Sequence, residues 1–235
     1  ATYRRVSVVS SQDRVKDPAN RLLARGSRFR MSAEAIRDNA LAVSGLLDLT
    51  IGGPSVKPYQ PAGYWSHMNF PKRTWQQSGG ENLYRRGLYT YWCRTFLHPS
   101  LLAFDAPTRE ECTAERIRSN TPQQALVLLN DPVYVEAARV FAQRLVAESG
   151  TDVSKGIKWA FREALARPPS SQEARLLKSL YNRHLGEYSK DKEAAVGLTS
   201  VGQKPVAGNL PRSELAAWTS VMRVILNLHE TITRY

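Results

Sequence analysis

Cysteine is scarce in this chain, which contains only Cys93 and Cys112 among its 235 residues. Neither belongs to a Cys-x-x-Cys-His motif, so no covalent haem attachment is expected here. A zinc site needs more ligands at closer spacing than these cysteines and the four scattered histidines provide. The spacing of the two cysteines allows a disulfide, and it is equally compatible with two free thiols. The sequence therefore predicts no metal site and no cofactor in this chain.

Long apolar runs and standard catalytic motifs are also missing. No apolar stretch approaches the roughly 18 to 20 residues that a helix needs to cross a bilayer, so we expect no transmembrane segment. The first residues lack the basic and apolar regions of an export signal. The sequence contains no Gly-x-Ser-x-Gly, no His-Glu-x-x-His and no calcium loop, and Gly52-Gly-Pro-Ser55 lacks the rest of a nucleotide loop. Catalysis would require a site without a standard motif.

Acidic residues are too few to balance the basic ones, and the formal net charge is +12. Such an excess attracts polyanions over long distances. Many of the arginines could instead pair with the chain's own carboxylates. They are dispersed along the chain and form no clustered basic strip, so nucleic acid is an unlikely partner. Anionic polysaccharide is a partner that fits the charge.

Helical periodicity and helix-end signals predict a mainly α fold, organised as a single helical domain over residues 1–235. Ser32 caps one helix, Pro122 starts another, and Ser170 with Glu173 can form a capping box. The helix near the C-terminus is apolar around most of its circumference, so we expect it to be buried. The expected helices cover 32–45, 121–130, 132–148, 153–166, 170–188, 190–201 and 213–227.

The segment 49–107 has a different character, because Gly and Pro interrupt every helical pattern in it. Long loops inside a compact domain are usually functional or cover a ligand. We therefore divide the domain into an irregular segment of about 49–107 and a helical part of about 108–235. The aromatic residues of the irregular segment are Tyr59, Tyr64, Trp65, Phe70, Trp75, Tyr84, Tyr89, Tyr91 and Trp92. They could form a packed collar around the helices or a binding surface.

Interleaved arginine and aromatic residues are the best binding candidates, because they can hold anionic groups or stack against sugar rings. The candidates are Arg85, Arg86, Tyr89, Trp92, Arg109, Arg116 and Arg118. A second interpretation makes Arg116 and Arg118, with Asn120 and Gln124, a buried network that satisfies backbone groups of the irregular segment.

Three residues are candidates for catalysis. The carboxylates of Asp105 and Glu110 could serve as acid and base if the fold brought them to a suitable separation. His229 could act as a general base, although capping of the last helix explains it as well.

Five blocks of the chain carry a family resemblance: 51–61, 83–92, 104–109, 109–131 and 226–230. Together they resemble the planctomycete-specific domain of unknown function. The resemblance implies the C-terminal part of a large exported protein, periplasmic or at the cell surface, that begins with cytochrome-c-like modules. Haem would then lie in upstream domains, and other domains of the parent protein would be partners.

These observations support a non-catalytic binding or scaffolding domain that contacts anionic polysaccharide or a haem-containing partner domain. Two alternatives stay open. One is a carbohydrate-active enzyme domain that uses carboxylates, and the other is a docking domain for a redox partner.

Overall fold

The computed structural model describes residues 5, 7, 10–67, 74–94, 96–150, 152–206 and 210–234. The predicted mainly α fold is confirmed. Phe70, one of the aromatic residues noted above, lies outside the described residues. The longer helices are α2 (Ala33–Ser44), α4 (Pro122–Asn130), α5 (Pro132–Ser149), α6 (Val153–Leu165), α7 (Ser171–Lys190), α8 (Lys192–Thr199) and α9 (Arg212–Leu226).

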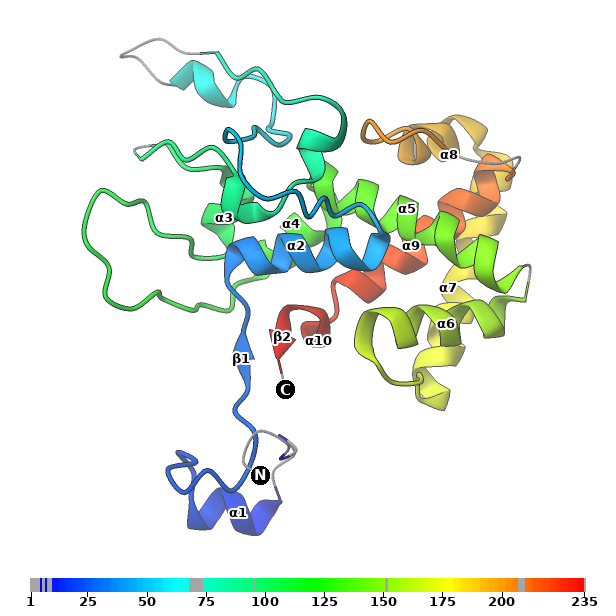
Figure 1. The fold of residues 1–235 in the computed structure, drawn as a ribbon. Coiled ribbons are helices and arrows are strands. Elements are labelled where there is room, and N and C mark those ends of the chain that lie inside the picture. The colour runs from blue at the N-terminus through cyan, green and yellow to red at the C-terminus, as the bar shows by residue number, and fades with distance from the viewer. Residues whose placement is uncertain are drawn as a thin grey trace.

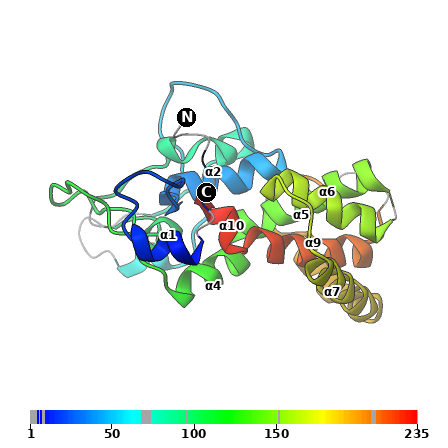
Figure 2. The ribbon, with the colours of Figure 1, turned by 90° about the horizontal axis from the view of Figure 1, so that it is seen from below.

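Helices α5 and α9 form the centre of the molecule (Figure 1). Helix α9 packs against α5, α7 and α8, while α2 covers another side of α5. Figure 2 shows the α5, α6, α7 and α9 group from below. The expected burial of the last long helix is confirmed, because Trp218, Val221 and Met222 of α9 are fully buried.

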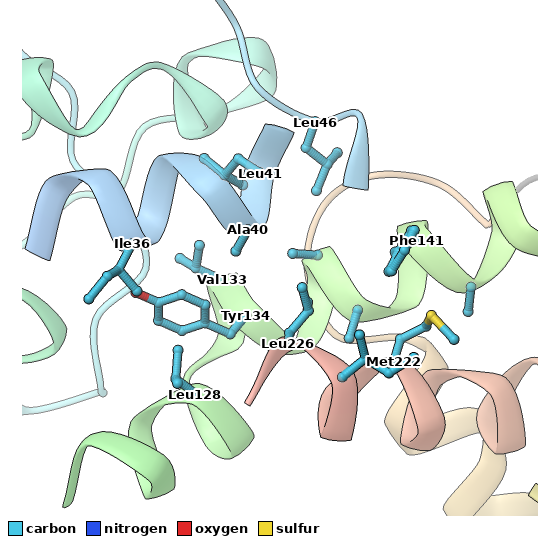
Figure 3. Packing of buried hydrophobic residues seen from close by; sticks show 14 of the residues in the cluster. Ile36, Ala40, Leu41, Leu46, Leu128, Val133, Tyr134, Phe141, Met222 and Leu226 are labelled. Carbon is cyan, nitrogen blue, oxygen red and sulfur yellow. The ribbon is translucent and has the colours of Figure 1, made fainter. Parts of the chain in front are cut away.

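One continuous apolar core joins α2, α4, α5 and α9. Figure 3 shows Ile36 and Ala40 of α2 on the side of Val133 and Tyr134 of α5, with Leu128 of α4 below them. Burial of such side chains stabilises the fold by roughly 1.5–3 kcal/mol each. This core fixes α2 against α5, and both helices then serve as the base on which the irregular segment lies.

Local signals set the helix ends as expected. The Ser32 hydroxyl accepts from the Ala35 N–H, and Gly45 ends the same helix in the left-handed region at φ 80°. Ser170 and Glu173 form the predicted capping box at the start of α7. Asp131 lies between α4 and α5 and caps α5 by accepting from the Val133 N–H.

Several short elements were not expected from the sequence. Strand β1 (Phe29–Arg30) pairs antiparallel with β2 (Thr233–Arg234), so the chain just before α2 lies beside the C-terminal residues. The short helices are α1 (Ser11–Lys16), α3 (Pro99–Ala103), α10 (His229–Ile232) and the 3₁₀ turns η2 (Tyr64–His67), η3 (Gly80–Tyr84) and η4 (Gly87–Tyr89). Helix α1 lies apart from the other helices at the end of β1 (Figure 1).

The segment 106–121 contains no helix, so the helices of the second half begin at Pro122. All residues from 109 to 118 are exposed. Cys112 is exposed in this segment and Cys93 is buried elsewhere, and both are free thiols.

Candidate ligand-binding site

Two buried charges hold the irregular segment on the helices. The Arg37 guanidinium of α2 donates to the backbone oxygens of Arg85 at 2.7 Å and Leu83 at 2.6 Å. Arg37 is 3% exposed. Since an irregular backbone leaves carbonyl groups without regular partners, a buried multi-donor side chain is well suited to satisfy them.

Glu136 of α5 makes the second connection. Its carboxylate accepts from the hydroxyls of Tyr59 at 3.0 Å and Tyr84 at 2.9 Å, and from the Lys204 N–H at 2.7 Å. Burial and the neighbouring Glu136 charge raise the pKa of both tyrosines, so they remain protonated donors. The network thereby ties three separate stretches of chain to α5.

Three extended stretches of the irregular segment lie side by side. The Val56 N–H donates to the Tyr89 oxygen at 2.8 Å, and the Tyr91 N–H donates to the Val56 oxygen at 2.7 Å. On the other side, Lys57 and Ser78 exchange two hydrogen bonds of 2.9 Å. This backbone framework places the aromatic residues near 65 and 75 against each other.

A cavity of about 540 Å³ opens on this framework. Ligand cavities in proteins commonly measure about 300–1,000 Å³ and combine aromatic walls with a few polar groups. Its lining residues are Gln60, Pro61, Ala62, Gly63, Tyr64, Trp65, Ser66, Thr74, Trp75 and Gln77. Amide and hydroxyl side chains supply the polar groups, and none of these lining residues is charged.

Trp65 and Trp75 form the aromatic part of the cavity wall. Their ring centroids lie 5.3 Å apart with an interplanar angle of 28°. The Trp75 Nε1–H donates to the Pro58 oxygen at 2.9 Å, which fixes the orientation of that ring. Trp75 also packs edge-on against Tyr91 and His98, with ring centroids 6.1 and 6.3 Å from its own. The pair is therefore held in place before any ligand arrives.

His98 contacts the Trp75 ring and binds the backbone of Tyr59. It is 3% exposed, and its Nε2 lies 2.7 Å from the Tyr59 oxygen. Burial lowers its pKa to about 4, so the ring is neutral at neutral pH. Since the Tyr59 carbonyl only accepts, the proton belongs on Nε2, and Nδ1 accepts from the Ser100 hydroxyl at 2.9 Å.

Gln60 has an unsatisfied donor at the cavity. Its Oε1 accepts from the Trp65 Nε1–H, and an indole N–H can only donate, so the amide orientation is fixed. The Gln60 Nε2 group is buried and has no hydrogen-bond partner among the described residues. A buried donor without a partner is uncommon in a folded protein and costs about 1–3 kcal/mol. Gln60 lines the cavity, so a shift of its amide toward the opening would bring this donor to a ligand oxygen.

Lys57 places a positive charge beside the tryptophan pair. Its Nζ lies 5.7 Å from the Trp75 ring centroid and 5.0 Å from that of Tyr91. The site therefore combines flat apolar rings, a free amide donor and a neighbouring cation. This combination suits a ligand with a ring face, several oxygens and a negative charge.

Two of the predicted binding residues stabilise a loop instead. Arg85 is 4% exposed and donates to the backbone oxygens of Pro54 and Thr50 at 3.0 and 3.2 Å, and also to Gly52. Its guanidinium lies 3.9 Å from the Tyr89 ring centroid, and the Tyr89 hydroxyl accepts from the Gly52 N–H at 2.8 Å.

The remaining predicted binding residues lie in two places. The Arg109 guanidinium lies 4.0 Å from the ring centroid of the half-buried Trp92. Arg116 pairs with Glu34 at 2.8 Å, and Arg118 lies 5.4 Å from the Phe29 ring centroid. Arg86 is exposed beside η4. None of these residues lines the 540 Å³ cavity.

The expected buried network around Arg118 is not what the structure shows, because Arg116, Arg118 and Asn120 are exposed. Gln124 is buried as expected, and its amide donates to the oxygens of Ser119 at 3.2 and 3.3 Å. Arg37 and Glu136, not Arg116, Arg118 and Asn120, form the buried hydrogen bonds to the irregular segment.

The three catalytic candidates have separate partners. Asp105 accepts from Arg30 and Ser119, Glu110 forms an exposed pair with Arg94 at 3.1 Å, and His229 lies 3.3 Å from the Thr233 hydroxyl. None of the three lines the cavity. Among the described residues, no group of three His, Cys, Asp or Glu side chains could hold a metal ion.

Trp65, Trp75, Gln60 and Lys57 were not predicted as site residues. The available signal was the position of two tryptophans on either side of a Gly/Pro-interrupted stretch. This signal was not enough to predict the cavity, because the cavity depends on contacts between stretches that are distant in sequence.

The structure is a mainly helical domain that carries an aromatic-lined cavity, a candidate ligand site, on an irregular segment. The chain belongs to the PSD1 family, described as a protein of unknown function (DUF1553), whose model matches residues 1–181. The match contains the cavity and four of the five sequence blocks noted above, whereas 226–230 lies beyond it. No curated protein matched the chain, and no solved structure matched it. Within the described residues, no helix has the length and apolar character needed to cross a membrane.

Proposed function

We propose that this domain is a non-catalytic binding module that holds anionic polysaccharide in the cavity lined by Trp65 and Trp75. The observation that carries the proposal is the stacked tryptophan pair beside the unpartnered Gln60 amide. A sugar ring offers an apolar face to an indole and hydroxyl oxygens to an amide donor. The indole rings are already held in position, and the Gln60 amide supplies the donor after a shift toward the cavity.

The charge of the chain favours an anionic sugar. The net charge of +12 attracts polyanions, and Lys57 places one of these charges beside Trp75. The described residues that line the cavity include no carboxylate that would repel a uronate or sulfate group.

A binding role is favoured over an enzymatic one because the candidate acids are engaged elsewhere. Asp105 is bound by Arg30 and Ser119, and Glu110 by Arg94. Neither faces the cavity where a sugar would lie. We further propose, from the sequence resemblance, that the parent protein is exported and multidomain, so that this module would tether it to an extracellular matrix.

Affinity electrophoresis on a panel of polysaccharides tests the proposal. Polygalacturonate, alginate and heparin represent anionic chains, and dextran represents a neutral one. We expect retardation by at least one anionic polysaccharide, and about tenfold weaker retention for Trp75→Ala, because the variant loses both ring contact and site shape. Gln77→Ala, which changes an exposed lining residue, should weaken binding without altering the melting temperature.

Trp159→Ala is the matched control, since Trp159 is a half-buried tryptophan of α6 that does not line the cavity. It should retain wild-type retardation. Retardation that disappears with salt but is the same in Trp75→Ala, Gln77→Ala and wild type would show that diffuse charge, not the cavity, binds the polysaccharide.

A further inference from the structure

A second, smaller cavity lies at the start of α2, where three arginines meet. It measures about 50 Å³, larger than the volume occupied by one water molecule. Arg30 reaches it from β1, and Arg116 and Arg118 reach it from the segment 106–121. Ser32 and Ala33, the N-cap and first residue of α2, complete the wall on that side.

Asp105 is the one carboxylate among the described residues of the cavity wall, and donors from this chain already occupy it. Asp105 accepts from Arg30 Nη2 at 2.5 Å, from the Ser119 N–H at 2.8 Å and from the Ser119 hydroxyl at 2.8 and 2.9 Å. It therefore neutralises Arg30 and holds Ser119 at the base of the exposed segment. Asp105 adopts a left-handed backbone conformation, with φ 61°, which non-glycine residues rarely take.

The arginines retain unused donors. Arg116 is paired with Glu34 at 2.8 Å, whereas the Arg118 guanidinium contacts the Phe29 ring and has no carboxylate partner in the part of the chain that the structure describes. The Arg30 side chain is 9% exposed, and its Nε–H has no acceptor among the described residues. With Arg30 paired to Asp105 and Arg116 to Glu34, the exposed Arg118 is the arginine of this cavity that has no ion pair among the described residues.

We propose that this cavity binds a tetrahedral oxyanion, either sulfate or a phosphate group. Its small volume admits a compact anion, and the arginine guanidinium is the side chain that best matches several oxyanion oxygens at once. The start of α2 adds to the favourable potential, because a helix N-terminus carries partial positive charge. The site does not depend on the tryptophan cavity and shares no lining residue with it.

Arg118 is the residue to change, because it is exposed and its removal should leave the fold intact. Thermal denaturation and calorimetric titration with sodium sulfate and sodium phosphate, at ionic strength held constant with sodium chloride, measure binding of the free anion. We expect a concentration-dependent rise in the melting temperature of the wild type. Arg118→Gln should weaken the dissociation constant about tenfold or more.

Arg183→Gln provides the control, since it removes the same charge from an exposed position on α7 and should bind as the wild type does. A heparin-derived sulfated oligosaccharide distinguishes a free anion from an ester group. Oligosaccharide binding that depends on Arg118, without binding of inorganic sulfate, supports the site as one for sulfate esters. Crystals soaked in selenate should show an anomalous peak between Arg30 and Arg118.

The proposal is overturned if neither anion stabilises the wild type beyond the chloride control and the sulfated oligosaccharide shows no binding that depends on Arg118. It is equally overturned if Arg118→Gln and Arg183→Gln lose affinity to the same extent, since the binding would then reflect overall charge.

Discussion

Replacing Glu136 with alanine tests how the irregular segment is held on the helices. Glu136 is 1% exposed and accepts from the Tyr59 and Tyr84 hydroxyls and from the Lys204 N–H. Arg139 Nη2 lies 3.5 Å from the same carboxylate and is equally buried. Alanine would remove the acceptor of three donors and leave the Arg139 charge without a counter-charge.

Breaking a buried ion pair from one side costs about 3–5 kcal/mol. In a domain of this size each 1 kcal/mol lowers the melting temperature by about 2–4 °C, so the expected loss is roughly 6–20 °C. Differential scanning calorimetry measures it. Glu163→Ala is the control, because Glu163 forms a half-exposed pair with Arg144 and should cost less than about 1 kcal/mol.

A Glu136→Ala variant that melts within about 2 °C of the wild type would refute the reasoning. It would mean that Tyr59, Tyr84 and Lys204 find other partners at little cost, and that the network does not hold the segment.

Three further predictions concern pH, an ion-pair cluster and a close contact. Burial raises the pKa of Asp131 to about 6, above its ordinary 3.8, so the folded chain holds this proton more tightly than the unfolded chain does. The resulting stabilisation is complete below about pH 4 and is lost as the pH rises through about 6. Asp131→Asn, which keeps a capping oxygen, should flatten the melting temperature over that range, and an unchanged slope in a calorimetric pH series would contradict this. Arg167 bonds Glu173 and Glu230 at 2.7 Å each, but all three are about a third exposed, so Arg167→Ala should cost about 1 kcal/mol in chemical denaturation. The cost should shrink at high salt, and a salt-independent loss would argue against an electrostatic role. A Cβ at Gly87 would lie 3.0 Å from the Glu34 backbone, so Gly87→Ala should destabilise by about 1–3 kcal/mol. Unchanged thermal unfolding of this variant would show that η4 can move away from α2.

Much of the helical framework could be predicted from the sequence because its signals are local. Ser32 and Ser170 cap their helices from one position before the first turn, and Pro122 supplies the fixed φ of a helix start. The apolar circumference of α9 likewise predicted its burial. Each of these inferences uses residues within a few positions of one another.

The cavity could not be predicted in the same way. Trp65 meets Trp75 because stretches near 56, 78 and 90 are hydrogen-bonded to one another, and no sequence period marks that pairing. The exposure of Arg118 could not be predicted from local sequence patterns either. Its neighbour Ile117 is 77% exposed, so the segment that carries both lacks an apolar face with which to pack on the core.

The charge pattern predicts an anionic partner, but it does not tell which arginines are free to bind one. Arg85 and Arg118 look alike in the sequence as arginines near aromatic residues. The Arg85 guanidinium donates to backbone oxygens of residues 50–54. The Arg118 guanidinium instead lies at the surface, beside the Phe29 ring. Only the folded chain distinguishes an arginine that holds a loop from one that can bind an anion.

Titration calorimetry of wild type and Gln60→Glu with a uronic-acid or sulfated oligosaccharide tests the central claim most directly. Glutamate keeps an acceptor for the Trp65 N–H but cannot donate to a ligand oxygen and repels an anion. The account predicts at least about tenfold weaker binding for Gln60→Glu, from the loss of a hydrogen bond and the added repulsion. Gln123→Glu, an identical charge change at an exposed position of α4, should bind as the wild type does. Equal affinity in Gln60→Glu and wild type would contradict the assignment of the tryptophan cavity as the binding site.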